Sequence, residues 1–247
     1  MGNLILLDDR RADRSRPTRD LRPAFFFDLR CPFSYLAAER VERMLGEVDW
    51  VPVASSALSH QPAPPRPRER QRARQRSEFL GLWTQAQQRA EQLRLPLVWP
   101  DRFPAEVRRA MRAAVYASET GAGARFGLAA IRLAFCGGFD LEDPEILAEA
   151  AAAASMTLED CLAAAGDPAR DLSPRATATG LRTRGIRRLP AVRLGTRWFV
   201  GEPGLMAASA MLRTAAARRR PLRSDGQRQS GGLGRVEADG GPLTPVA

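Results

Sequence analysis

Residues 25–36 read FFFDLRCPFSYL, and this stretch sets a cysteine where a buried strand turns into a helix. The three successive aromatic residues 25–27 are typical of a strand packed on both faces, whereas residues 37–45 have helical spacing and helical propensity. Cys31 lies at the junction, and Pro32 suits the first helical turn. Because free N–H groups and the positive dipole end of a helix favour a thiolate, the sequence predicts a Cys31 pKa below that of a free cysteine.

The length and composition of the chain define its general class. A chain of 247 residues with 44% apolar content is long enough for one globular domain with an inserted subdomain. No apolar run approaches the roughly 20 residues that a membrane helix needs, so we expect a cytoplasmic protein without a membrane partner. Three scattered cysteines and the single histidine, His60, provide neither a disulfide framework nor a metal-ligand spacing, and no metal is expected.

The net charge of +10 is carried entirely by arginine, because the chain has no lysine. The positive excess is concentrated in three segments: residues 1–22, 66–76 and 213–247. Residues 66–76 alone hold six arginines and one glutamate. No aromatic side chains alternate with these arginines to provide stacking platforms, so the composition does not predict a nucleic-acid-binding protein.

Proline, glycine and helix-capping residues mark the boundaries between the segments of the chain. We expect disordered tails at 1–22 and 221–247, a first folded part at 23–58, a helical insertion at 59–184 and a second folded part at 185–220. Residues 48–54 read as a second strand and 55–67 as a loop. Residues 189–194 and 198–200 read as a hairpin, and a helix follows over 201–213. Within the insertion, four helix starts are predicted, at Pro104, at Asp143-Pro144, at Thr157 and at Ser173-Pro174.

Together, residues 31–37 (CPFSYLA), the helical insert and Leu189-Pro190 before the hairpin resemble the DsbA-like thioredoxin-fold superfamily. The branch of that superfamily with 2-hydroxychromene-2-carboxylate isomerases and kappa-class glutathione transferases is the most similar. The resemblance covers roughly 24–213. It implies an α/β thioredoxin-like fold of order βαβ…ββα with a large all-helical insertion.

The resemblance also implies roles for individual residues. Cys31 matches the first cysteine of the oxidoreductases' Cys-x-x-Cys, and equally the serine with which the isomerases and transferases hold a glutathione sulfur. Ser34 matches the second cysteine, so the resolving thiol is absent. Pro190 matches a cis-proline beside the active site, and Leu189 matches the residue whose backbone pairs with a bound thiol peptide. Pro32 and Phe33 are further expected substrate or glutathione contacts.

Glutathione is the cofactor that the resemblance implies. Glu202 is the expected carboxylate for the ammonium group of the peptide, and Gln61 matches an asparagine in the loop after the second strand. Two departures accompany this match. Residues 202–204 read Glu-Pro-Gly where glutathione-binding members carry a Ser-Asp-Arg type segment, and Gln85 and Gln88 stand where an Asp/Arg pair is expected.

Three hypotheses for function follow. The first is a monothiol oxidoreductase with Cys31 as nucleophile and Ser34 as hydrogen-bond donor to it, acting on a small-molecule or protein thiol. The second is a glutathione-dependent isomerase or transferase, and the third is a non-catalytic thiol- or peptide-binding relative. Cys136 and Cys161 fall on apolar helix patterns and are predicted core residues. Similar proteins are commonly dimers, so a homodimer is one expected assembly.

Overall fold

The sheet at the centre of the protein has four strands in the part of the chain that the computed structural model describes, residues 22–58, 68–100, 103 and 105–219. Its order is β2-β1-β3-β4. The β1 strand pairs in parallel with β2 and antiparallel with β3, which pairs antiparallel with β4. The strands are β1 (Ala24–Phe27), β2 (Asp49–Pro52), β3 (Ala191–Leu194) and β4 (Arg197–Val200). Since β1 and β2 are parallel, a crossover must join them, and the helix after Cys31 provides it.

The aromatic run of β1 is buried on both faces of the sheet, as the sequence predicted. Phe25 and Phe27 pack with Trp50 in the larger hydrophobic core. Phe26 points to the opposite face and packs in a second, smaller core, into which Cys31 also packs. Successive side chains of a strand point to opposite faces of the sheet, so this short segment packs into both hydrophobic cores.

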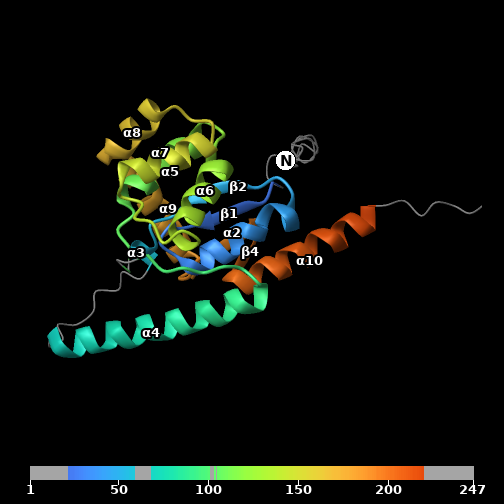
Figure 1. Ribbon diagram of the computed structural model, residues 1–247. Helices are drawn as coiled ribbons and strands as arrows, with labels where there is room; N and C mark the ends of the chain where they lie inside the picture. The colour runs from blue at the N-terminus through green and yellow to red at the C-terminus, as the bar shows by residue number, and fades with distance from the viewer. Residues whose placement is uncertain (1–21, 59–67, 101–102, 104, 220–247) are drawn as a thin grey trace, which may run out of the picture.

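Helices cover both faces of the sheet and build the insertion (Figure 1). The larger core joins the sheet to α2, α5, α6 and α10, and the smaller core joins it to α3 and α9. In Figure 1, α5 to α8 gather above the sheet, while α4 and α10 each extend beyond the rest of the body. The helices are α2 (Pro32–Leu45), α3 (Ser55–Leu58), α4 (Arg68–Leu93), α5 (Arg108–Glu119), α6 (Gly123–Phe135), α7 (Pro144–Ala153), α8 (Leu158–Gly166), α9 (Leu172–Thr183) and α10 (Glu202–Arg219), with a 3-10 turn η2 (Pro168–Asp171) before α9.

The predicted order βαβ, helical insertion, ββα is confirmed. Two predicted caps are also confirmed, because Asp143 accepts a hydrogen bond from the Glu145 N–H and Thr157 from that of Asp160. The predicted start at Ser173-Pro174 is wrong, since α9 follows directly on η2 and begins one residue earlier, at Leu172.

Two further differences from the sequence expectations concern helices around the sheet. Residues 55–58 form α3 rather than the predicted loop, and the helix expected from Pro104 begins at Arg108. Among the described helices, none combines the length and the apolar content that crossing a bilayer requires.

Candidate active site

The turn between β1 and α2 places Cys31 at the helix N-terminus. Cys31 is the N-cap of α2 in an extended backbone conformation, and Pro32 occupies the first turn. The Cys31 N–H donates to the Asp28 carbonyl at 3.0 Å, which closes the turn. The Cys31 Sγ lies 3.8 Å from the carbonyl oxygen of Leu189, a residue 158 positions later in the chain. The fold thus brings the predicted nucleophile to the segment before the hairpin.

The segment opposite Cys31 is buried and tied to the sheet. Leu189 is 7% exposed, and the peptide bond between Leu189 and Pro190 is cis. The Pro190 carbonyl accepts a hydrogen bond from the Gly201 N–H at 2.7 Å, so the segment is fastened to the end of β4. The predicted pair Leu189-Pro190 and the predicted Cys31 therefore share one site.

Ser34 faces Cys31 from the first turn of α2. The Ser34 side chain is fully buried, and its Oγ accepts a hydrogen bond from the Asp28 N–H at 3.3 Å. Its hydroxyl hydrogen is then left to donate to the Cys31 sulfur. The N–H groups of Phe33 and Ser34 also point at this sulfur. Three donors thus converge on the atom that would carry the charge of a thiolate.

Burial raises the pKa of the Cys31 thiol above that of free cysteine, so the sequence-based prediction of a lowered pKa is wrong. The Ser34 hydroxyl and the two N–H donors oppose the shift, while the nearby Asp28 carboxylate adds to it. The sequence pattern contains the helix terminus, but the removal of water from the sulfur depends on tertiary packing. That desolvation outweighs the helix N–H groups.

Asp28 is a site residue that sequence reasoning missed. Its side chain is 2% exposed, and its two carboxylate oxygens accept from the Arg30 N–H at 3.0 Å and from the Ser55 N–H at 2.8 Å. The Arg30 Nε lies 3.7 Å from the same carboxylate and 3.2 Å from the Ser55 hydroxyl. Asp28 therefore joins the Cys31 turn to the start of α3. The sequence signal was an acidic residue between two apolar ones, Phe27 and Leu29, at the end of a buried strand.

Glu202 lies in an ion-pair cluster. Its side chain is 1% exposed and bonds to the guanidinium groups of Arg40 in α2 and Arg89 in α4. The Arg89 Nε donates to Oε2 at 2.6 Å, and a second Arg89 nitrogen to Oε1 at 3.1 Å. Since two arginines occupy this carboxylate, the structure gives it a role in joining three helices. Its predicted role toward a peptide ammonium stays a prediction.

Of the other residues that the sequence analysis selected, two are described by the structure and two are not. Pro32 is buried, and Phe33 is partly buried against the larger core. Gln61 and His60 lie outside the described residues. Among the described residues, no group of three or more His, Cys, Asp or Glu side chains is placed to hold a metal ion.

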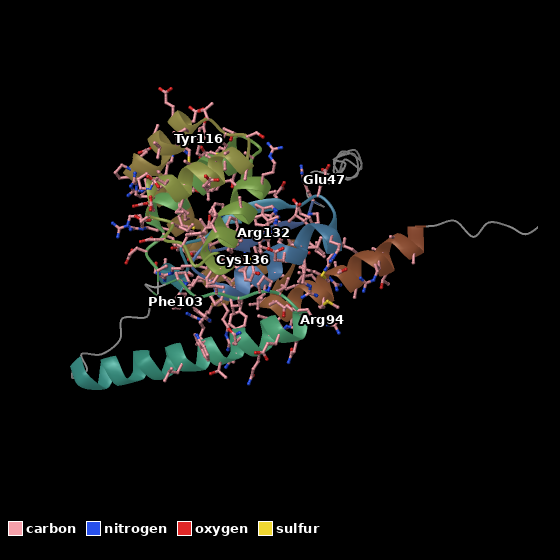
Figure 2. All side chains as sticks on the ribbon, viewed as in Figure 1. Glu47, Arg94, Phe103, Tyr116, Arg132 and Cys136 are labelled. Atoms are coloured by element: carbon pink, nitrogen blue, oxygen red, sulfur yellow. The ribbon has the colours of Figure 1, made fainter. Side chains whose placement is uncertain are left out.

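The remaining cysteines lie away from the Cys31 turn. Cys161 is buried, and its thiol donates to the Leu147 carbonyl at 3.8 Å. Cys136 lies 3.1 Å from the Tyr35 hydroxyl, which donates to the Pro96 carbonyl at 2.6 Å. Figure 2 shows Cys136 and Arg132 near α2. Cys161 is the core residue that the sequence predicted, whereas Cys136 is only partly buried.

A pocket of about 140 Å³ opens beside the Cys31 turn. Its walls come from the turn itself, from the residues after β2, and from the N-terminal ends of α5 and α9. Asp28 and Arg30 belong to the turn side, whereas Arg108 and Arg112 of α5 and Arg175 of α9 belong to the helical side. Sequence reasoning did not select these arginines, because their positions carry no motif.

The sheet order, the helical insertion and a helix-capping cysteine opposite a cis-proline define a thioredoxin-fold protein. The chain belongs to the family of DSBA-like thioredoxin domains, which matches residues 24–212. No curated protein matches the sequence.

Solved structures that share the fold include the following two. A 2-hydroxychromene-2-carboxylate isomerase is 18% identical with a TM-score of 0.65, over 79% of this chain and 97% of its own. A Streptomyces coelicolor protein described as a probable DsbA oxidoreductase is 20% identical with a TM-score of 0.61, over 85% of this chain and 99% of its own. At these identities the likeness shows the fold.

Proposed function

We propose that this chain is a thiol–disulfide oxidoreductase of the monothiol type, with Cys31 as its nucleophile. The observation that carries the proposal is the position of the Cys31 sulfur, which faces both the Ser34 hydroxyl and the Leu189 carbonyl. The family and the fold support an enzyme of the oxidoreductase or isomerase kind. Ser34 in place of a second cysteine supports the monothiol form.

The proposed reaction has two exchanges. The Cys31 thiolate attacks one sulfur of a disulfide, forms a mixed disulfide and releases the other half as a thiolate, which takes up a proton. Ser34 has no sulfur with which to attack that mixed disulfide, so an external thiol must do so. Glutathione is the candidate for this thiol. Its thiolate attacks the substrate sulfur, leaves with it as a new disulfide and returns Cys31 to the thiolate.

The raised Cys31 pKa sets the expected pH dependence. The thiol is mainly protonated at neutral pH, so exchange should accelerate as the pH rises toward the thiol pKa. Asp28→Asn removes the nearby negative charge and should move the midpoint of the alkylation rate to lower pH. Removal of the Ser34 donor by Ser34→Ala should move it to higher pH. If both variants share the midpoint of the parent, these two groups do not act on the sulfur.

The central test is a comparison of the parent with Cys31→Ser and Ser34→Cys. Each protein is incubated with hydroxyethyl disulfide at several glutathione concentrations, and adducts are mapped by mass spectrometry. The parent should hold a mixed disulfide at Cys31, and its turnover should depend on glutathione. Ser34→Cys should gain exchange that needs no added thiol to release the adduct. Exchange that persists in Cys31→Ser would place the reactive thiol elsewhere and contradict the proposal.

A second candidate function is addition of glutathione to an unsaturated or electrophilic small molecule. The pocket beside the Cys31 turn supports it, because about 140 Å³ suits part of a small molecule. Cys31→Ser distinguishes the two candidates. It should abolish disulfide exchange yet preserve conjugation of glutathione to chlorodinitrobenzene, since the similar isomerases use serine at this position. If the parent traps no adduct and conjugates nothing, the binding-protein hypothesis is favoured.

A further inference from the structure

The pocket beside the Cys31 turn has an unusual charge distribution. Five arginines and three carboxylates line it, and the carboxylates are Asp28, Glu106 and Asp171. Two of these carboxylates already have partners. Asp28 accepts from two backbone N–H groups with Arg30 beside it, and Asp171 forms two hydrogen bonds to Arg112, at 2.8 and 3.0 Å. The charge that a ligand would meet therefore depends on the side chains that remain.

Two of the lining arginines have no carboxylate of their own. Arg108 and Arg175 are exposed, and neither has a hydrogen bond or ion pair within the described residues. Both guanidinium groups lie close enough to Asp171 to help lower its pKa, although Arg112 is the main cause. Their positive potential thus acts at Asp171, which lines the pocket.

The rest of the wall cancels only part of this potential. Glu106 is the single lining carboxylate without a partner among the described residues. Arg170 is paired with Glu119 at 2.7 Å, and that glutamate does not line the pocket. The positive end of the α5 dipole lies in the same wall, since Arg108 is the first residue of α5. After internal pairing, the pocket keeps an excess of positive charge.

The pocket also has a fixed relation to the reactive thiol. Arg30 directly precedes Cys31, and Asp28 both lines the pocket and acts electrostatically on the Cys31 sulfur. The wall of the pocket thus includes the residue next to Cys31, and this adjacency is the ground for assigning the pocket to another group of the molecule that reacts there. A carboxylate there would be held by guanidinium groups, which bind carboxylates through paired N–H donors.

We propose that Arg108 and Arg175 select small disulfides and thiols that carry a carboxylate a few bonds from the reacting sulfur. This inference rests on the proposed reaction at Cys31 and adds the substrate class. Arg112 lines the same pocket and is engaged by Asp171. Neutral and cationic disulfides of similar size should react more slowly, because they leave both guanidinium groups without a counter-charge.

The first test uses alkylation and needs no turnover. Iodoacetate carries a carboxylate and iodoacetamide does not, and the ratio of their rates at Cys31 cancels the thiolate fraction. Relative to free cysteine, the parent should favour iodoacetate. Arg108→Gln and Arg175→Gln should each lower the ratio about fivefold, as for unit charges about 4 Å apart in water, and Arg175→Glu should lower it further.

A matched control removes the same charge elsewhere. Arg43 is exposed in the last turn of α2, at the far end of the helix from Cys31, so Arg43→Gln should leave the ratio unchanged. A ratio unaffected by both pocket variants would overturn the proposal. An equal loss in Arg43→Gln would also overturn it, because the effect would then belong to overall charge.

The second test separates this inference from the proposed function. The parent is given the disulfide of mercaptopropionate, hydroxyethyl disulfide or cystamine, with glutathione as reductant. The anionic disulfide should react fastest, and Arg175→Gln should reduce that advantage. Equal rates for all three would contradict the inference and leave the proposed function standing. If no disulfide reacts while iodoacetate is still favoured, the proposed function fails and the anion pocket remains.

Discussion

The ion-pair cluster around Glu202 leads to a prediction about stability that also tests its sequence-based role. Glu202 at the start of α10 is 1% exposed and joins Arg40 of α2 to Arg89 of α4, whose side chains are 11% and 30% exposed. Glu202→Gln removes the charge and leaves two guanidinium groups facing each other. Removal of one partner of a buried ion pair costs about 3 to 5 kcal/mol.

The partial exposure of Arg89 places the expected cost at the lower end of that range. Its guanidinium can turn toward water, whereas among the described residues Arg40 keeps only the Met206 sulfur, 3.0 Å from one of its nitrogens. We therefore expect a loss of about 3 kcal/mol in the free energy of unfolding. For a domain of this size that corresponds to a fall of about 6 to 12 °C in melting temperature. Urea and thermal unfolding followed by circular dichroism measure both.

The chain offers a matched control in Glu39, which pairs with Arg132 at 2.6 Å. The Arg132 side chain is 51% exposed, so Glu39→Gln should cost less than about 1 kcal/mol. If Glu202→Gln costs no more than Glu39→Gln, the cluster does not hold the three helices together. If instead Glu202→Gln leaves stability unchanged and weakens glutathione binding, the ligand role implied by the resemblance is correct and the structural reasoning is wrong.

Three further predictions concern packing and charge. Gly127→Ala should cost about 1 to 3 kcal/mol in unfolding free energy, because the new Cβ would lie 2.9 Å from the Trp50 ring. Gly81→Ala is the control and should be neutral or stabilising, because its Cβ would meet nothing within 4 Å. Equal melting temperatures for the two variants would contradict this prediction. Tyr35→Phe removes the hydrogen bond to the Pro96 carbonyl and should lower the free energy of unfolding in urea by about 1 kcal/mol. The alkylation rate of Cys31 should stay the same, and a changed rate would refute this prediction. Asp171→Asn should lower the free energy of unfolding by about 1.5 to 3 kcal/mol at neutral pH. Because Arg112 lowers the folded-state pKa of Asp171, the difference in stability between parent and variant should close as the pH falls below 3.8. A stability difference that stays constant with pH would argue against the ion pair.

Local sequence patterns were sufficient for the elements around Cys31. The aromatic run of β1, the proline after Cys31 and the caps Asp143 and Thr157 each act within a few residues. Strand alternation, helix capping and proline geometry are short-range effects, and they therefore appear in the order of the residues. The βαβ, helical insertion, ββα order followed from these elements and from the resemblance, together with the position of Leu189-Pro190.

The electrostatics of the site depended on tertiary structure. The helix N-terminus at Cys31 predicted a lowered pKa, but packing partly shields the sulfur from water and sets the Asp28 carboxylate beside it, so the pKa rises. Glu202 was assigned from its place after β4, whereas its charge is neutralised by arginines 113 and 162 positions away in the chain. Arg108 and Arg175 belong to no motif in the sequence, and only the folding of α5 and α9 onto the sheet brings them to one pocket. Desolvation and charge pairing act through space between distant segments, so the sequence determined where the thiol lies and the tertiary structure determined its environment.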